Sequence, residues 1–204
     1  MSHGSLYIIS APSGTGKTSL VKGLLESLTN IEVSVSHTTR AMRPGELNGI
    51  NYHFVTTSEF EMMIKKKAFL EYTSIYENHY GTSREWVKKK LQAGIDVILE
   101  IEWQGAAQIR ELFPETISIF ILPPHPKALE QRLRARGQDK EEVILHRLKE
   151  AKREVKHCKD YDYLVVNDQF EVALSDLRSI IRAERCKIDK QKIRFKTLIK
   201  DLGK

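Results

Sequence analysis

The chain has 204 residues, 41% of them hydrophobic and 29% charged, and its 33 basic and 27 acidic residues give a formal net charge of +6. This length fits one domain with inserted lobes and is sufficient to bury a hydrophobic core. No apolar run approaches the ~20 residues that cross a membrane, the N-terminus lacks the pattern of a secretion signal, and two cysteines are too few for a disulfide framework, so we expect a cytoplasmic protein.

The first predicted strand, Leu6–Ser10, runs directly into a glycine-rich segment that ends in Lys17 and Thr18. Small residues let the backbone N–H groups of such a loop turn toward anionic oxygens, and the helix expected from Lys17 points its positive end at the same place. Lys17 is expected to reach the β- and γ-phosphates of a nucleoside triphosphate, and the Thr18 hydroxyl to coordinate Mg²⁺. Ala11 stands where the pattern G-x-x-x-x-G-K-[ST] has its first glycine. We interpret the segment as a phosphate-binding loop rather than an ordinary turn, with these triphosphate-binding residues: Ala11, Pro12, Ser13, Gly14, Thr15, Gly16, Lys17 and Thr18.

A strand at Glu32–Ser36 is followed by short polar and aromatic pieces from about 37 to 90, which we interpret as a small mixed lobe inserted into the core. Arg40 and Arg43 lie three residues apart before a Pro-Gly turn, and two guanidinium groups so placed can bind one phosphate bidentately. Tyr52 and Tyr80 can each add a hydroxyl to the same oxygens. The alternative is that both arginines are solvated surface residues.

Carboxylates form the next group of candidates. Guanine presents two donors beside one acceptor, so a site that recognises it needs carboxylates to accept and a hydroxyl to donate; Glu71, Thr82 and Glu102 offer these groups. In a strand at Val97–Glu102, a period of two places Glu100 and Glu102 on one face, at the carboxyl end where α/β sheets bind ligands. Glu100 is then the candidate that holds Mg²⁺ through water. Solvated charges at the end of a strand are the alternative.

The remaining chain continues to alternate strand-like and helical segments, which predicts a largely parallel sheet covered by helices. The basic turn from Arg132 to Asp139 has the character of a mobile lid. Arginines on a closing lid can stabilise the charge of a phosphoryl group in transfer, and we assign this role to Arg132, Arg136 and Arg147. The other predicted strands are Ile117–Leu122 and Tyr163–Val166, and the predicted helices begin near Lys17, Ala106, Pro126, Lys140 and Phe170.

The positive charge is concentrated in the tail. Residues 185–204 contain eight basic and two acidic residues, so residues 1–184 carry 25 of each sign. A nucleic-acid-binding arm is one interpretation. We favour an amphipathic helix with solvated lysines that docks on the body or on a second subunit, because apolar residues form a partial stripe. They are Ile188, Ile193, Phe195, Leu198, Ile199 and Leu202.

Along nearly its whole length the chain resembles guanylate kinase, specifically the bacterial enzymes. Besides the phosphate-binding loop from Ser10 to Thr18, these segments carry the resemblance: Val33-Ser-Val-Ser-His-Thr-Thr-Arg40, Arg43-Pro-Gly-Glu46, Tyr80-Gly-Thr-Ser83, Trp103-Gln-Gly105, Ile119-Phe-Ile-Leu-Pro-Pro124, Arg136-Gly-Gln-Asp139 and Tyr161-Asp-Tyr-Leu-Val-Val-Asn-Asp168. The chain departs from the family in Glu100-Ile-Glu102, where Asp-x-Asp is usual.

The resemblance implies an α/β fold, a P-loop NTPase core with a parallel sheet flanked by helices, and ATP-dependent phosphorylation of GMP, with dGMP also accepted, in purine metabolism. It assigns Asn167 and Asp168 to ATP; Lys17, Arg132, Arg136 and Arg147 to the transferred phosphoryl group; and Ser36, Arg40, Arg43, Tyr52, Glu71, Tyr80, Thr82 and Glu102 to GMP. The implied organisation is a domain at 1–184 (core about 1–36, 91–124 and 156–184; GMP-binding lobe about 37–90; lid about 125–155), followed by a basic helical tail at 185–204. We expect Mg²⁺ as cofactor, no nucleic-acid or membrane partner, and leave a homo-oligomer open.

Two other functions compete with this interpretation. A guanylate kinase-like scaffold module keeps the fold but typically lacks the loop lysine, whereas Lys17 is present here. A kinase for another nucleoside monophosphate would need a different set of base-reading groups from Glu71, Thr82 and Glu102.

Overall fold

The computed structural model of the chain describes residues 3–75, 77–135 and 140–203. Its strands are β1 (Leu6–Ser10), β2 (Ile31–Val33), β3 (His37–Thr38), β4 (His53–Phe54), β5 (Phe69–Ile75), β6 (Asn78–Ser83), β7 (Asp96–Glu100), β8 (Ile117–Leu122) and β9 (Tyr163–Val166). In the described part of the chain they form a five-stranded sheet of order β2-β7-β1-β8-β9 and a four-stranded sheet of order β4-β3-β6-β5. The pairs β2–β7 and β8–β9 are parallel. The predicted α/β class with a mostly parallel sheet is therefore confirmed.

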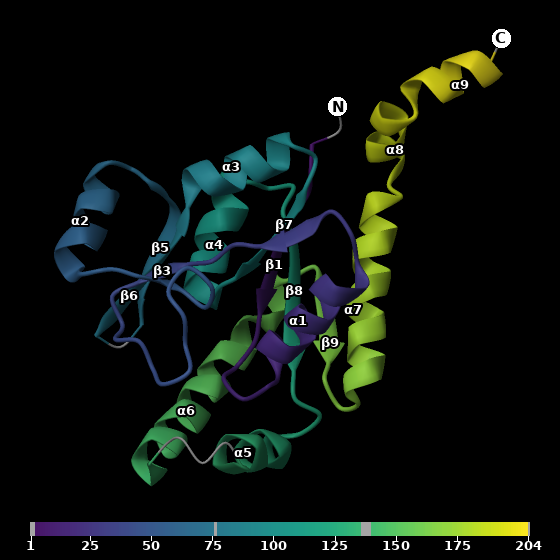
Figure 1. Cartoon of the computed structure of the whole chain (residues 1–204). Helices are drawn as coiled ribbons and strands as arrows, with labels where there is room; N and C mark the ends of the chain where they lie inside the picture. Colours follow the sequence, from purple (N-terminus) through teal and green to yellow (C-terminus); the bar gives the residue numbers. More distant parts are fainter. Residues whose placement is uncertain (1–2, 76, 136–139, 204) are drawn as a thin grey trace. The chain divides into compact units, whose positions relative to one another are not determined.

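Helices alternate with single strands or groups of strands along most of the chain (Figure 1). They are α1 (Lys17–Ser27), α2 (Thr57–Lys65), α3 (Arg84–Gln92), α4 (Trp103–Leu112), α5 (Pro126–Ala135), α6 (Glu141–Glu154), α7 (Phe170–Arg185), α8 (Ile188–Arg194) and α9 (Lys196–Leu202), with a 3-10 helix at Val155–Asp160. Among the described residues, none of these helices combines the length and the apolar character that a bilayer-spanning segment requires.

The chain divides into two compact units. The first unit comprises Met1–His3, Ile9–Asn30 and Ser118–Lys204, and the second comprises Gly4–Ile8 and Ile31–Ile117. All residues predicted to bind ATP lie in the first, and all residues predicted to bind GMP lie in the second.

In the first unit, α1 packs along α7 (Figure 1). Leu20 and Leu24 of α1 and Leu177 of α7 are fully buried, as expected where two amphipathic helices share their apolar faces. Gly23 permits this approach, because a Cβ at that position would lie 3.2 Å from the Leu174 side chain. The buried apolar contact keeps α1, which begins at the phosphate-binding loop, fixed against the body of the unit.

In the second unit, a hairpin of β5 and β6 carries most of the four-stranded sheet, and an aromatic cluster forms its core. Phe60 of α2 is fully buried, with its ring centroid 4.5 Å from that of Phe69 and 5.4 Å from that of His79. Helix α2 begins at a capping box, in which Thr56 and Glu59 satisfy each other's backbone N–H groups. These contacts give the short strands an apolar platform.

The predicted elements agree with this fold at several boundaries. Strands β1, β8 and β9 occupy their predicted ranges, and α1, α5 and α7 begin at their predicted residues. The prediction for β7 was wrong at its end, because the strand stops at Glu100 and Glu102 is the N-cap residue of α4. Helices α2 and α3 were not predicted. The tail is helical as expected, but it breaks at Phe195 into α8 and α9.

The apolar stripe of the tail is exposed in the described structure. The exposed fraction of its residues ranges from 40% for Phe195 to 79% for Leu202. Docking of this stripe on the body is therefore not seen, and docking on a second subunit stays a prediction.

Candidate active site

The phosphate-binding loop occupies residues 11–16 between β1 and α1 (Figure 1). Gly14 and Gly16 have φ values of 90° and 97°, in the left-handed region that side chains with a Cβ avoid. The N–H of Thr15 donates to the carbonyl of Pro12 at 3.1 Å and closes the turn. Ala11 is buried, 5% exposed, so a small residue fits at the start of the loop.

Close packing also requires the two glycines. A Cβ at Gly16 would lie 2.6 Å from the Asn167 amide nitrogen, and one at Gly14 would lie 2.9 Å from the Leu133 side chain. Larger residues would therefore push the loop away from the end of β9 and from α5. The two glycines of the loop are therefore needed both for its backbone conformation and for its close packing.

The carbonyl oxygen of Thr15 is the point at which later segments hold the loop. It accepts hydrogen bonds from Asn167 Nδ2 at 2.7 Å and from Arg132 Nη1 at 3.1 Å. Arg132 Nη2 also donates to the carbonyl of Asn167 at 2.9 Å. Arg147 Nη1 contacts Ser13 Oγ at 3.4 Å. The structure therefore brings together the loop and residues more than a hundred positions away.

Not every predicted residue of this group takes part in those contacts. Asp168 is exposed directly after the buried Asn167. Arg136 lies outside the described residues. Thr18 is exposed in the first turn of α1, one residue after Lys17.

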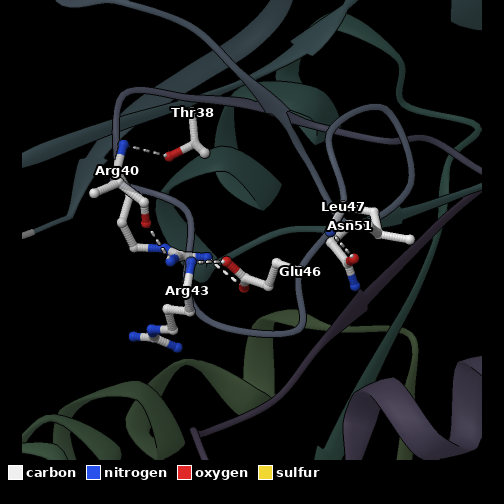
Figure 2. Close-up of polar contacts among 7 residues, drawn as sticks. Thr38, Arg40, Arg43, Glu46, Leu47 and Asn51 are labelled. Carbon is white, nitrogen blue, oxygen red and sulfur yellow. Dashed lines mark hydrogen bonds and ion pairs between the residues drawn. The ribbon is translucent and has the colours of Figure 1, made fainter.

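In the second unit, Arg40 is held by Glu46 (Figure 2). The Arg40 guanidinium donates from Nη2 to Glu46 Oε1 at 2.6 Å and from Nη1 to the carbonyl of Ala41 at 2.7 Å. The second oxygen of Glu46 accepts the backbone N–H of Arg43 at 2.8 Å. Burial opposes the charge of Arg40, but the hydrogen bond and charge of Glu46 outweigh it and raise the pKa of Arg40 above its ordinary value. One carboxylate thus fixes both the arginine and the turn that follows it.

The two predicted phosphate-binding arginines have different surroundings. The Arg40 guanidinium lies 5.3 Å from the ring centroid of Tyr52, and that ring is 6.0 Å from the ring of Tyr80. Three of the predicted residues therefore gather around one another. Figure 2 shows the Arg43 side chain pointing away from Glu46. Ser36 is half-buried just before β3.

Glu71 and Thr82 form a buried pair on adjacent strands β5 and β6. Glu71 is 3% exposed and Thr82 is fully buried, and the Thr82 hydroxyl donates to Glu71 Oε1 at 2.6 Å. Burial raises the pKa of Glu71 to about 7, although hydrogen bonds from the Thr82 side chain and backbone act in the opposite direction. The carboxyl is therefore an acceptor whose charge is sensitive to its surroundings near neutral pH.

Gly105 makes room for the Glu71 carboxylate. A Cβ at this position, in the first turn of α4, would lie 2.5 Å from Glu71 Oε2 and 3.2 Å from its Cδ. Glu102 is the half-buried N-cap residue of the same helix and makes no side-chain capping hydrogen bond. Glu71 and the beginning of α4 are thus neighbours, whereas Glu100 ends β7 and is also half-buried.

Sequence reasoning missed the roles of Glu46 and Gly105. Glu46 follows Arg43 by three residues across a Pro-Gly turn, a spacing at which a carboxylate can return to an earlier backbone N–H. Gly105 gives no such local signal, because its contact with Glu71 depends on how α4 packs on β5.

Comparisons with known proteins agree on one family. The sequence model of the family described as guanylate kinase matches residues 3–184. The chain is similar to the guanylate kinases of Aliivibrio fischeri and Salmonella typhimurium, each 55% identical over 204 residues with 99% of both chains covered. It is also similar to the crystal structure of guanylate kinase from Anaplasma phagocytophilum, with a TM-score of 0.78 and 35% identity over 92% of this chain and 89% of that one.

Proposed function

The chain belongs to the guanylate kinase family, and from that premise we propose how its residues divide the work of transferring the γ-phosphoryl group of ATP to GMP. The observation that carries the assignment of base specificity is the buried Glu71–Thr82 pair, with 2.6 Å between the hydroxyl and carboxylate oxygens. A buried carboxylate beside a hydroxyl matches the donor-rich edge of guanine. Adenine would present an acceptor to the same carboxylate.

In this proposal, the first unit binds ATP. Backbone N–H groups of residues 11–16 and the Lys17 ammonium would surround the phosphates. Arg132 uses two of its N–H groups on the Thr15 and Asn167 carbonyls. A guanidinium has five donors, so three are left for a phosphoryl oxygen. Arg147 and Arg136 would supply the remaining positive charge, while Asn167 and Asp168 would border the adenine.

The second unit would bind GMP at two ends. The phosphate would meet Arg40 and Arg43, with hydroxyls from Ser36, Tyr52 and Tyr80. The Glu46 contact orients Arg40 before the ligand arrives, which lowers the entropy cost of binding. Glu71, Thr82 and Glu102 would read the guanine base.

We also propose Mg²⁺ as the cofactor. Mg²⁺ prefers oxygen ligands and is usually bound through one or two protein groups together with substrate phosphates and water. Thr18 is exposed in α1 of the first unit and Glu100 is half-buried at the end of β7 in the second, and the side chain of each carries an oxygen donor of this kind, so the chemistry of each residue fits the ion. When bound, Mg²⁺ would neutralise charge on the β- and γ-phosphate oxygens.

The proposal extends to organisation and context. We propose the domain at 1–184 with a lobe at about 37–90, a lid at about 125–155 and a tail at 185–204. Because the assigned contacts address the phosphate and the base, dGMP would also be a substrate, and the reaction would recycle GMP in purine metabolism. Cys158 and Cys186 are free thiols, which suits a reducing cytoplasm.

A coupled ADP-release assay with ATP and a panel of GMP, dGMP, AMP, UMP and dTMP tests this function. We expect turnover with GMP and dGMP and, because a mismatched buried polar site can discriminate by ~10⁴, almost none with AMP. Equal turnover of AMP and GMP would refute the role of Glu71 and Thr82.

A further inference from the structure

A basic hollow lies in the first unit, where the end of α1 meets one face of α7. Its volume is about 550 Å³. Three arginines line it, Arg178, Arg182 and Arg185, together with the hydroxyl groups of Thr29 and Ser175. No acidic residue is among the described residues that line it.

The spacing of these residues explains why they face one hollow. On α7, Ser175, Arg178, Arg182 and Arg185 follow one another at intervals of three and four residues, which places them on a single face of the helix. The buried apolar residues of α7, including Leu177 and Ile181, lie on the neighbouring stripe. The basic character of the hollow therefore follows from the sequence of one helix face.

The charge of the hollow is not neutralised by the protein. Within the described residues, the guanidinium groups of Arg178 and Arg182 have no hydrogen-bond or ion-pair partner. In contrast, Arg40, Arg134 and Arg153 each pair with a glutamate. Like charges held on one helix face repel each other, and an anion between them would remove that cost.

Arg185 hydrogen-bonds two backbone carbonyls beside the hollow. Its Nη2 donates to the carbonyl oxygens of Thr29 at 2.8 Å and Asn30 at 3.2 Å. These carbonyls follow the negative end of α1 and would otherwise oppose an anion. With them already hydrogen-bonded, the remaining donors at the surface of the hollow are guanidinium and hydroxyl groups.

We propose that this hollow binds a small polyphosphate anion, either free or as the phosphate chain of a nucleotide. Its volume lies within the range of ~300–1,000 Å³ that small-molecule sites occupy. Guanidinium groups bind phosphate oxygens in a fork geometry, and two accessible arginines one helical turn apart can bind successive phosphates. The site is distinct from the phosphate-binding loop, because the 11 residues of α1 separate Lys17 from Ser27, a rise of roughly 15 Å.

Titration calorimetry with inorganic tripolyphosphate tests the proposal. The Lys17→Ala variant weakens binding at the phosphate-binding loop, and the part of the remaining signal that depends on Arg178 and Arg182 reports the second site. Adding Arg178→Gln and Arg182→Gln should reduce the remaining affinity at least about tenfold, as expected for two charge-assisted contacts. The matched control adds Lys192→Gln and Lys196→Gln, which removes the same charge from α8 and α9 and should change the affinity less than about twofold.

A second measurement uses the unmodified protein, so it does not depend on whether a variant folds. The guanidinium N–H signals of Arg178 and Arg182 in NMR spectra of the unmodified protein should shift on addition of tripolyphosphate. Unshifted signals at saturation, or equal losses in the two multiple variants, would overturn the proposal. Turnover of ATP and GMP should be unchanged by Arg178→Gln and Arg182→Gln alone, which shows that the fold is intact.

The choice of probe separates the sources of the phosphate chain. Equal affinity for tripolyphosphate and ATP would mean that the site recognises the phosphates alone. Tighter binding of ATP would mean that the nucleoside contributes as well. Either result supports the proposed site. A single-stranded oligonucleotide of twelve residues that binds more tightly than either, through the same arginines, would overturn the assignment to a small anion.

Discussion

Replacing Gly105 by alanine should impair GMP binding while leaving ATP binding intact. The added methyl group would lie 2.5 Å from Glu71 Oε2. Ordinary contact between a carbon and a non-bonded heavy atom is ~3.5 Å, so the carboxylate must retreat by roughly 1 Å. Gly105 and Glu71 are both buried, which leaves the two groups little space in which to separate.

The size of the effect follows from the contact that is disturbed. Glu71 is held by the Thr82 hydroxyl at 2.6 Å, and a carboxylate displaced by 1 Å loses that bond or its alignment with the base. A hydrogen bond to a charged group contributes ~1.5–3 kcal/mol. The KM for GMP should therefore rise about 10- to 150-fold. The KM for ATP should not change, because the phosphate-binding loop is built from residues of the other unit.

Initial rates measured with varied GMP at saturating ATP, and then the reverse, give the two KM values. Ala107→Gly is the matched control, since it lowers the helix propensity of α4 by ~1 kcal/mol at an exposed position without touching Glu71. In the double variant Gly105→Ala with Glu71→Asp, the shorter acid leaves room for the methyl, so the combined loss should be smaller than the sum of the two. An unchanged KM for GMP in Gly105→Ala, or an equal rise in Ala107→Gly, would refute the reasoning.

Three further predictions concern the charged groups. Burial raises the pKa of Glu71 to about 7, so kcat/KM for GMP should rise with pH through that value. The values of kcat/KM for Glu71→Gln should be lower and independent of pH in this range. If the Gln variant keeps the pH dependence of the unmodified protein, another group titrates. Lys17→Ala should lower kcat at least ~10²-fold, the typical loss of one phosphoryl-stabilising donor, without lowering the melting temperature, and near-normal turnover would exclude its role. Glu46→Gln should raise the KM for GMP about five- to tenfold, because Arg40 loses its 2.6 Å ion pair and such a pair contributes about 1 kcal/mol. A lower KM would mean instead that Glu46 competes with the substrate phosphate for Arg40.

Local signals predicted much of the fold. Strands β1 and β8 consist mostly of apolar residues and are almost entirely buried, so their limits could be identified from the sequence. Helix α2 was missed although its capping box, Thr56 to Glu59, is visible in the sequence, because the polar and aromatic pieces around it were interpreted only as a small mixed lobe. The end of strand β7 was predicted two residues too far along the chain, because periodicity alone does not show where a helix N-cap begins.

The candidate site could be predicted where its residues are adjacent in the chain. The phosphate-binding loop is such a segment, since Gly14 and Gly16 shape it through their own left-handed backbone conformation. The contact of Arg132 with Thr15 joins residues 117 positions apart, and that of Asn167 with Thr15 joins residues 152 positions apart. No periodicity encodes those pairs. They arise from the order of the strands in the sheet, which a single sequence does not determine.

At Glu71, the proposed role in recognising guanine opposes the stability of the fold. An acid whose pKa rises from 4.5 to about 7 on folding binds more protons in the folded state, so the free energy of unfolding falls as pH rises across that interval. At 1.36 kcal/mol per unit, the total approaches about 3 kcal/mol above pH 7. Thr82 offsets only part of the cost of burial, and the two donors of guanine would stabilise the ionised carboxylate further. A base without those donors would leave the same charge buried and poorly solvated. In the proposed site, the stability that the free protein loses at this position would therefore allow it to discriminate against adenine.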